Sequence, residues 1–228
     1  MINLRPANER GRARYSWLQS RHTFSFAHYY DPRHMGVSAL RVINDDRVSP
    51  GAGFETHPHR DMEIISYVLS GQIEHKDTMG FHTVLKAGDV QVMSAGTGIL
   101  HSEFNPSSTE ELHFLQIWIQ PNKRGVEPGY SEKNFSDVTG VTRIVSPDGR
   151  DGSLPIHQNA SIYKIALANE ITEFASDPKR PYYLHVARGQ LKVNGIKMSE
   201  GDGATIAAEE ILNFVSDQTA EALLFELP

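Results

Sequence analysis

Closely spaced turn signals divide the chain into short segments, and this spacing constrains the fold more than any other feature of the sequence. The turn signals include Asp31-Pro32, Pro50-Gly51, Ser70-Gly71, Met79-Gly80, Ala87-Gly88-Asp89 and Gly96-Thr97-Gly98. Between them lie runs rich in β-branched and aromatic residues, such as "EIISYVL" and "HFLQIWIQ". Short strands separated by turns roughly every eight to twelve residues are typical of an all-β sandwich or barrel. Residues 131–135 and 207–211 are only weak helix candidates, so the sequence predicts an all-β protein.

An internal repeat indicates two similar β-domains. "LSGQIEH" resembles "ARGQLKV", and "LKAGDVQVM" resembles "MSEGDGATI", so that Gly71 pairs with Gly189 and Gly88 with Gly201. "LQIWI" and "LLFEL" extend the match in the same order along the chain. Proline, glycine and charged residues cluster over residues 121–135 and predict a linker there. We therefore expect an N-terminal domain over residues 1–125 and a C-terminal domain over residues 126–228.

Composition excludes several classes of protein. The chain has no cysteine, which excludes disulfides, thiolate catalysis and sulfur-ligated zinc. The formal net charge of −6 argues against direct binding of nucleic acid, and we interpret the arginines near the N-terminus as a solvated arm. No apolar run approaches the roughly 20 residues of a membrane helix. The polar N-terminal segment does not resemble a secretory signal, so we expect a cytoplasmic protein that does not bind membranes.

Two pairs of residues have the spacing of metal ligands on strands. His57 and His59 would project from the same face of a strand, as would His101 and Glu103 after a glycine-rich turn. The chain between the pairs is long enough for two hairpins, which could bring the second pair back beside the first. Three neutral imidazoles and one carboxylate suit a divalent first-row metal with open coordination positions. An incidental surface pair is the alternative, and spacing alone leaves both interpretations open.

Glu63 is a further candidate near the first pair. On a regular strand Glu63 would share the face of His57 and His59, either as an additional ligand or as an acceptor for the N–H of a ligating imidazole. We favour the acceptor role. The remaining histidines are scattered, and we expect them to be hydrogen-bonded or exposed. Motifs of serine hydrolases and of helix-borne zinc proteases are absent.

Long motifs resemble a known family. "GAGFETHPHRDMEIISYVLSG" is similar to the first motif of the cupin superfamily, and "GDVQVMSAGTGILHSEFNPSS" is similar to the second. The sequence around "HPHRDME" and "HSE" resembles the pirin family, including its bacterial quercetinase-like members. The upstream stretch "HTFSFAHYYDPRHMGVSALRVINDD" also matches, so the similarity covers nearly the whole chain. Ser94 replaces the proline of many cupins and the turn before His101 is longer, and both departures are shared by pirins.

The resemblance implies a bicupin, that is, two double-stranded β-helix (jelly-roll) barrels packed face to face. It implies metal ligands at His57, His59, His101 and Glu103, which leaves Glu63, the ligand glutamate of other cupins, off the metal. Only the N-terminal barrel is then expected to hold metal. The second repeat agrees, because it has no His-X-His before Gly189 and reads "ILNFV" where the first reads "ILHSEF".

The resemblance also implies a dioxygenase that uses Fe(II) and O₂ to cleave the heterocyclic ring of a flavonol such as quercetin, releasing carbon monoxide. The flavonol would chelate the metal through its 3-hydroxyl and 4-carbonyl oxygens, with Glu103 as ligand and base. An apolar cleft for this small aromatic substrate would involve Phe54, Met93, Phe104 or Trp118. The donor set also accepts Zn, Ni, Mn, Co or Cu.

Two other functions stay open from the sequence. The first is a metal-bearing, redox-sensitive regulatory protein that acts through protein partners. The second is a dioxygenase whose substrate is another enol or a catechol. Because a bicupin contains both barrels in one chain, we expect a monomer.

Overall fold

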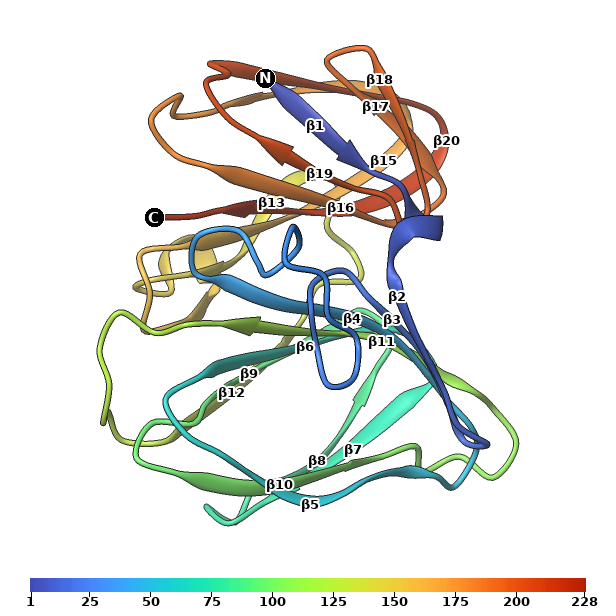
Figure 1. Cartoon of the computed structure of the whole chain (residues 1–228), viewed down its shortest axis with the longest axis vertical. Helices are drawn as coiled ribbons and strands as arrows, with labels where there is room; N and C mark the ends of the chain where they lie inside the picture. Colours follow the sequence, from blue (N-terminus) through green and yellow to red (C-terminus); the bar gives the residue numbers. More distant parts are fainter. The chain divides into compact units, whose positions relative to one another are not determined.

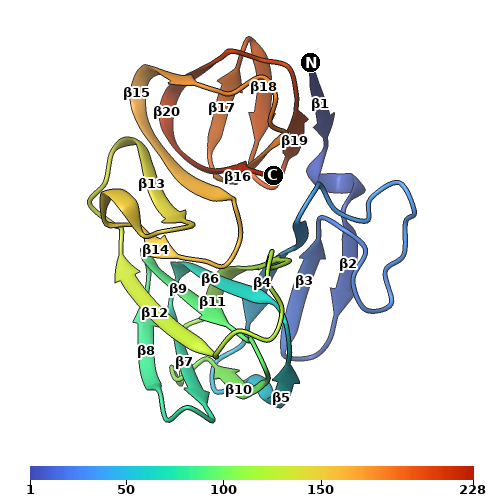
Figure 2. The same ribbon diagram turned by 90° about the vertical axis from the view of Figure 1, so that its left-hand side faces the viewer.

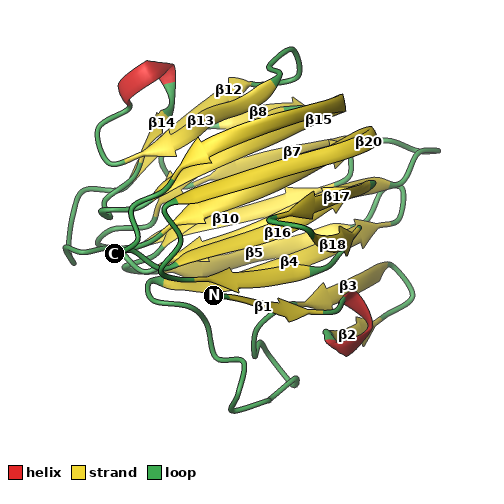
Figure 3. Ribbon diagram, turned by 90° about the horizontal axis from the view of Figure 1, so that it is seen from above, coloured by secondary structure: helices red, strands yellow, loops and turns green.

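The computed structural model describes residues 1–228, and its regular secondary structure is almost entirely β-strand (Figure 3). The only helices are two 3₁₀ turns, η1 (Ala7–Glu9) and η2 (Arg150–Gly152). The prediction of an all-β fold is confirmed. Of the two weak helix candidates, residues 131–134 lie in a strand and residues 207–210 precede one. None of the helices has the length and apolar character needed to cross a membrane.

The chain forms two compact units. The N-terminal unit comprises Gly11–Ser136 and Leu154–Gln158, and the C-terminal unit comprises Met1–Arg10, Asp137–Ser153 and Asn159–Pro228. Residues 129–134, which the sequence predicted to be linker, form an edge strand of the N-terminal unit. The residues of each unit contact one another more than they contact the other unit. The expected division at residue 125 into two independently folding domains stays a proposal.

The N-terminal unit consists of two antiparallel sheets, visible in Figure 1 as two layers. The larger sheet has the order β12-β9-β6-β11-β4-β3-β2 and the smaller has the order β5-β10-β7-β8. The strands of the larger sheet are β2 (Gly11–Arg14), β3 (Leu18–His22), β4 (Leu40–Val48), β6 (Glu63–Ser70), β9 (Asp89–Ser94), β11 (Leu112–Ile119) and β12 (Gly129–Asn134). Those of the smaller sheet are β5 (Gly53–His59), β7 (Gln72–Asp77), β8 (His82–Lys86) and β10 (Ile99–Phe104), and the short β14 (Leu154–Pro155) belongs to the same unit.

Alternation along the strands places apolar side chains between the two sheets. In β3, Leu18 is buried whereas its neighbour Gln19 is exposed. One apolar cluster gathers Leu18, Val48, Val68, Ile73, Leu85, Leu112 and Phe114 from strands of both sheets. This cluster fixes the sheets against each other, so that side chains from β5 and β10 can face those from β4 and β11.

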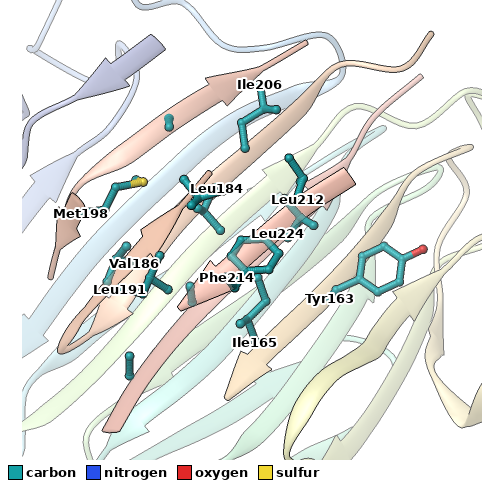
Figure 4. Packing of buried hydrophobic residues seen from close by; sticks show 14 of the residues in the cluster. Tyr163, Ile165, Leu184, Val186, Leu191, Met198, Ile206, Leu212, Phe214 and Leu224 are labelled. Atoms are coloured by element: carbon teal, nitrogen blue, oxygen red, sulfur yellow. The ribbon is translucent and has the colours of Figure 1, made fainter. Parts of the chain in front are cut away.

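The C-terminal unit is built around one sheet with the order β1-β19-β16-β20-β15-β13, and its long strands β15 and β20 curve strongly (Figure 2). The strands are β1 (Ile2–Arg5), β13 (Gly140–Ser146), β15 (Ser161–Ala175), β16 (Tyr182–Arg188), β19 (Gly203–Ile206) and β20 (Ile211–Glu226), with the hairpin β17 (Gln190–Val193) and β18 (Ile196–Ser199). An apolar core fills its interior, including Leu184, Phe214 and Leu224 (Figure 4). Arg5 and Arg10 are buried in this unit, so the interpretation of the N-terminal arginines as a solvated arm is wrong at these positions.

The repeated glycines occupy equivalent places in the two units. Gly71 and Gly189 have φ angles of +75° and +69°, which only glycine adopts without strain. A Cβ atom on Gly71 would lie 2.6 Å from the carbonyl oxygen of Glu111, and one on Gly189 would meet the carbonyl oxygen of Thr219. Each glycine links two successive strands that do not pair with each other, β6 to β7 and β16 to β17, in close contact with the backbone of a neighbouring segment. This equivalence supports the internal repeat read from the sequence.

Candidate metal centre

The two ligand pairs lie on neighbouring antiparallel strands. His57 and His59 are on β5, and His101 and Glu103 are on β10, with His101 directly opposite His57 in the register. The ligand nitrogens of the three histidines lie within 4.8 Å of one another. Their ring centroids are separated by 4.5 Å for His57 and His101 and by 4.9 Å for the other two pairs. The structure thus brings the two sequence-predicted pairs together.

Hydrogen bonding leaves imidazole nitrogens available to an ion. The Nδ1–H of His57 donates to the backbone carbonyl of Glu55 at 2.7 Å, which leaves the lone pair of Nε2 free to ligate. His101 is buried, and neither of its nitrogens has a hydrogen-bond partner. Buried polar atoms are normally paired, and an ion bound to one of these nitrogens would remove the deficit. The donor set therefore fits a divalent metal ion.

The electrostatics also favour ligation. Burial, with the neighbouring His101 and His57, lowers the pKa of His59 to about 4. Burial, with His57 and His75, lowers the pKa of His101 to about 3. Both imidazoles are therefore neutral near pH 7, which is the form that binds metal.

Two hydrogen bonds hold the carboxylate of Glu103 in place. Its carboxylate accepts a hydrogen bond from Ser66 Oγ at 2.9 Å on Oε1 and one from Gln116 Nε2 at 2.7 Å on Oε2. A ligand oxygen of Glu103 lies within 4.8 Å of ligand nitrogens of His75 and His101. Glu103 is not part of the three-histidine group at that distance, so its role as fourth ligand stays a prediction.

His75 is a neighbour of the centre that the sequence did not single out. On β7 it lies opposite Glu103, and its Nε2–H donates to Asp77 Oδ2 at 2.9 Å, with both side chains fully buried. Backbone N–H groups of Met79 and Phe81 donate to the other oxygen of Asp77. His75 Nδ1 has no partner. The signal in the sequence was a third pair at i and i+2, His75 and Asp77, on a predicted strand.

A cavity of about 800 Å³ opens beside the centre, and His57, His59 and Glu103 are part of its wall. Five aromatic residues also line it: Trp17, Phe26, Phe54, Phe104 and Trp118. Three of the expected cleft residues are among them. Met93 is not, because it is buried in a core cluster with Ile64 and Ile99. The volume and the apolar walls suit a flat ligand of moderate size.

Comparison with known proteins identifies the family. Residues 3–119 match the Pirin family, and the chain is 51% identical over its full length to a quercetin 2,3-dioxygenase of Escherichia coli, 99% of which is covered. This chain is a pirin. Residues 143–227 match the quercetinase C-terminal cupin domain. A pirin-like protein of Caulobacter vibrioides is 42% identical, with 99% of each chain covered. The crystal structure of the bacterial pirin YhhW from Escherichia coli in complex with nickel(II) superposes with a TM-score of 0.96 at 51% identity, covering 100% of this chain and 99% of that one.

A row of polar side chains crosses the larger sheet of this pirin beneath the centre. Asn44, Gln116, Ser66 and Gln91 are direct neighbours in the register of β4, β11, β6 and β9, and all are largely buried. At one end of the row, His22 Nδ1–H donates to Asn44 Oδ1 at 2.8 Å. Its middle members, Gln116 and Ser66, hold Glu103. The row explains why an otherwise apolar sheet has polar residues on its inner face.

Glu63 does not share the face of His57 and His59. The strand β5 ends at His59, Asp61 has a φ angle of +49°, and Glu63 begins β6 in the other sheet. Its Oε2 accepts a hydrogen bond from Ser94 Oγ at 2.7 Å. Burial raises the pKa of Glu63, against the opposing effects of Ser94 and His157. The assumption of one regular strand was therefore wrong, and a role for Glu63 as acceptor for a ligating imidazole stays a prediction.

Proposed function

We propose that this pirin is an Fe(II)-dependent dioxygenase that cleaves the heterocyclic ring of a flavonol such as quercetin with O₂ and releases carbon monoxide. The observation that carries the proposal is the convergence of His57, His59 and His101 at the wall of an aromatic-lined cavity. Full-length similarity to a quercetin 2,3-dioxygenase supports the same activity.

We assign the metal to His57, His59, His101 and Glu103. When bound, a divalent iron would act as a Lewis acid toward the 3-hydroxyl and 4-carbonyl oxygens of the flavonol and supply the redox chemistry with O₂. Since a nitrogen-rich donor set also accepts other first-row metals, the choice of iron needs its own test.

The side chains of the chain itself position the substrate and move its proton. The aromatic walls bind a flat ring system and exclude water from it. Glu103 lies at the edge of the cavity with its carboxylate oriented by Ser66 and Gln116. In this position Glu103 accepts the proton of the 3-hydroxyl group as the flavonol binds.

The test is carbon monoxide release from quercetin by protein that is loaded anaerobically with Fe(II) and then exposed to O₂. The same assay on protein loaded with Ni(II), Mn(II), Co(II), Cu(II) or Zn(II) tests the choice of metal. His57→Ala, His101→Ala and Glu103→Ala should each abolish release. His82→Ala is the matched control, because His82 is exposed and bonded to Glu74 away from the cavity. Protein that holds one iron per chain and releases no carbon monoxide would contradict the proposal and favour a regulatory role.

A further inference from the structure

Asp46 is a buried carboxyl group that the proposed reaction does not use. It lies on β4, two residues after Asn44, and both side chains line the cavity. Asp46 is only 3% exposed, and its Oδ1 has no hydrogen-bond partner. A buried carboxyl oxygen without a donor is costly, so an unpaired one in a cavity wall calls for an explanation.

The protein itself supplies no cation to Asp46. The charged groups that act on it are Asp45 and Glu103, both acidic, and its one donor is the hydroxyl of Ser20 on the neighbouring strand β3. Burial raises the pKa of Asp46 to about 7. A structural ion pair is therefore not the reason for placing a carboxyl group here, whereas a ligand that brings its own hydrogen-bond donor would satisfy the free oxygen.

We propose that Asp46 binds a phenolic hydroxyl group of the substrate that is remote from the two metal-binding oxygens, so that the cavity selects polyhydroxylated flavonols. This inference rests on the proposed function. A flavonol whose chelating oxygens bind the metal at the histidines would keep its other hydroxyl groups inside the cavity, where five aromatic side chains offer them no strong hydrogen-bond acceptor. The polar side chains of the wall other than the histidines, Glu103 and Gln116 are Asn44, Asp46 and Glu55. Of these, Glu55 is exposed to solvent, whereas Asn44 and Asp46 are buried.

Binding can be measured without turnover. Both tryptophans of the chain, Trp17 and Trp118, line the cavity, so quenching of their fluorescence reports its occupation. The protein is loaded with Zn(II), which has no redox chemistry, and titrated in the absence of O₂ with two ligands. Quercetin has remote hydroxyl groups, and 3-hydroxyflavone has only the chelating pair.

Wild-type protein should bind quercetin more tightly than 3-hydroxyflavone. In Asp46→Leu, at a pH well above 7 where Asp46 is ionised, the dissociation constant for quercetin should rise about tenfold to hundredfold, the usual value of one hydrogen bond to a charged acceptor. The dissociation constant for 3-hydroxyflavone should change little. The matched control is Asp45→Asn, because Asp45 is on the same strand but pairs with His113 and does not line the cavity.

The outcomes separate the two proposals. If the ratio of the dissociation constants for quercetin and 3-hydroxyflavone is the same in wild type and in Asp46→Leu, the role of Asp46 is overturned and the dioxygenase proposal stays intact. Failure of wild-type protein to bind either flavonol, with one Zn(II) per chain, overturns both. One Zn(II) per chain and retained binding of 3-hydroxyflavone in Asp46→Leu show that the variant is folded.

Discussion

The hydrogen bond from Gln116 to Glu103 offers a direct test of how the metal centre is held. Glu103 is 2% exposed, and its carboxylate has two side-chain donors, Ser66 and Gln116. Gln116→Leu keeps the approximate volume of the side chain and removes the 2.7 Å donor to Oε2. A hydrogen bond to a charged group contributes about 1.5–3 kcal/mol. Because ~1.4 kcal/mol corresponds to a factor of ten, the affinity for metal should fall about tenfold to hundredfold.

The assay is competition for the metal between the protein and a chromophoric chelator, under anaerobic conditions for Fe(II). Gln19→Leu is the control, because Gln19 is exposed on the outer face of β3. Ser66→Ala should have an effect of similar size. Since Ser66 Oγ also bonds Gln116 Oε1 at 3.3 Å, the double variant should lose less than the sum of the two single losses. Unchanged affinity in Gln116→Leu would refute the idea that this donor orients Glu103 for metal.

Three further predictions concern other parts of the N-terminal unit. His75→Ala should weaken metal binding about tenfold, measured in the same competition assay. The reason is that the hydrogen bond between His75 and Asp77 fixes the side chain that packs beside His101 and Glu103. Gly71→Ala should destabilise the protein by about 2 kcal/mol or more, measured by urea unfolding, because its φ is +75° and its Cβ would meet the carbonyl oxygen of Glu111. The folded-state pKa of Asp46 is raised from 3.8 to about 7, so folded protein loses stability as the pH rises through that window. The stability of Asp46→Asn relative to wild type should therefore increase as the pH rises from about 4 to about 7. A difference between the two urea midpoints that does not change with pH would contradict this.

Local patterns in the sequence were sufficient to predict the strands and the projection of His57 and His59 from one face of a strand. Alternation and glycine turns define strands from the chain alone, and a spacing of two residues places side chains on one face. His57 and His59 needed only that rule. Bringing His101 to them needed in addition the family resemblance, because the pairing of β5 with β10 joins segments some forty residues apart.

Long-range register could not be read from the sequence, and it determines the rest of the site. Asn44, Gln116 and Ser66 each look like an isolated polar residue in an apolar strand. They become one row only because β4, β11 and β6 are adjacent in the sheet, in an order that differs from their order in the chain. The predicted orientation of Glu63 was wrong for a related reason. Asp61 has a positive φ angle, the chain turns there, and Glu63 begins a strand of the other sheet.

The two units show what the buried polar row contributes. In the C-terminal unit, the stretch that corresponds to "ILHSEF" buries Leu212 and Phe214 in an apolar core, so this part of the repeat packs without polar side chains at those positions. In the N-terminal unit the same part of the repeat carries His101 and Glu103, and Ser66 and Gln116 are needed on the facing sheet to satisfy the carboxylate. Burial of polar groups lowers stability unless each one is paired. The polar row is therefore a requirement of the metal centre rather than of the fold. Replacing the centre and the row together by apolar residues should be tolerated better than replacing either alone.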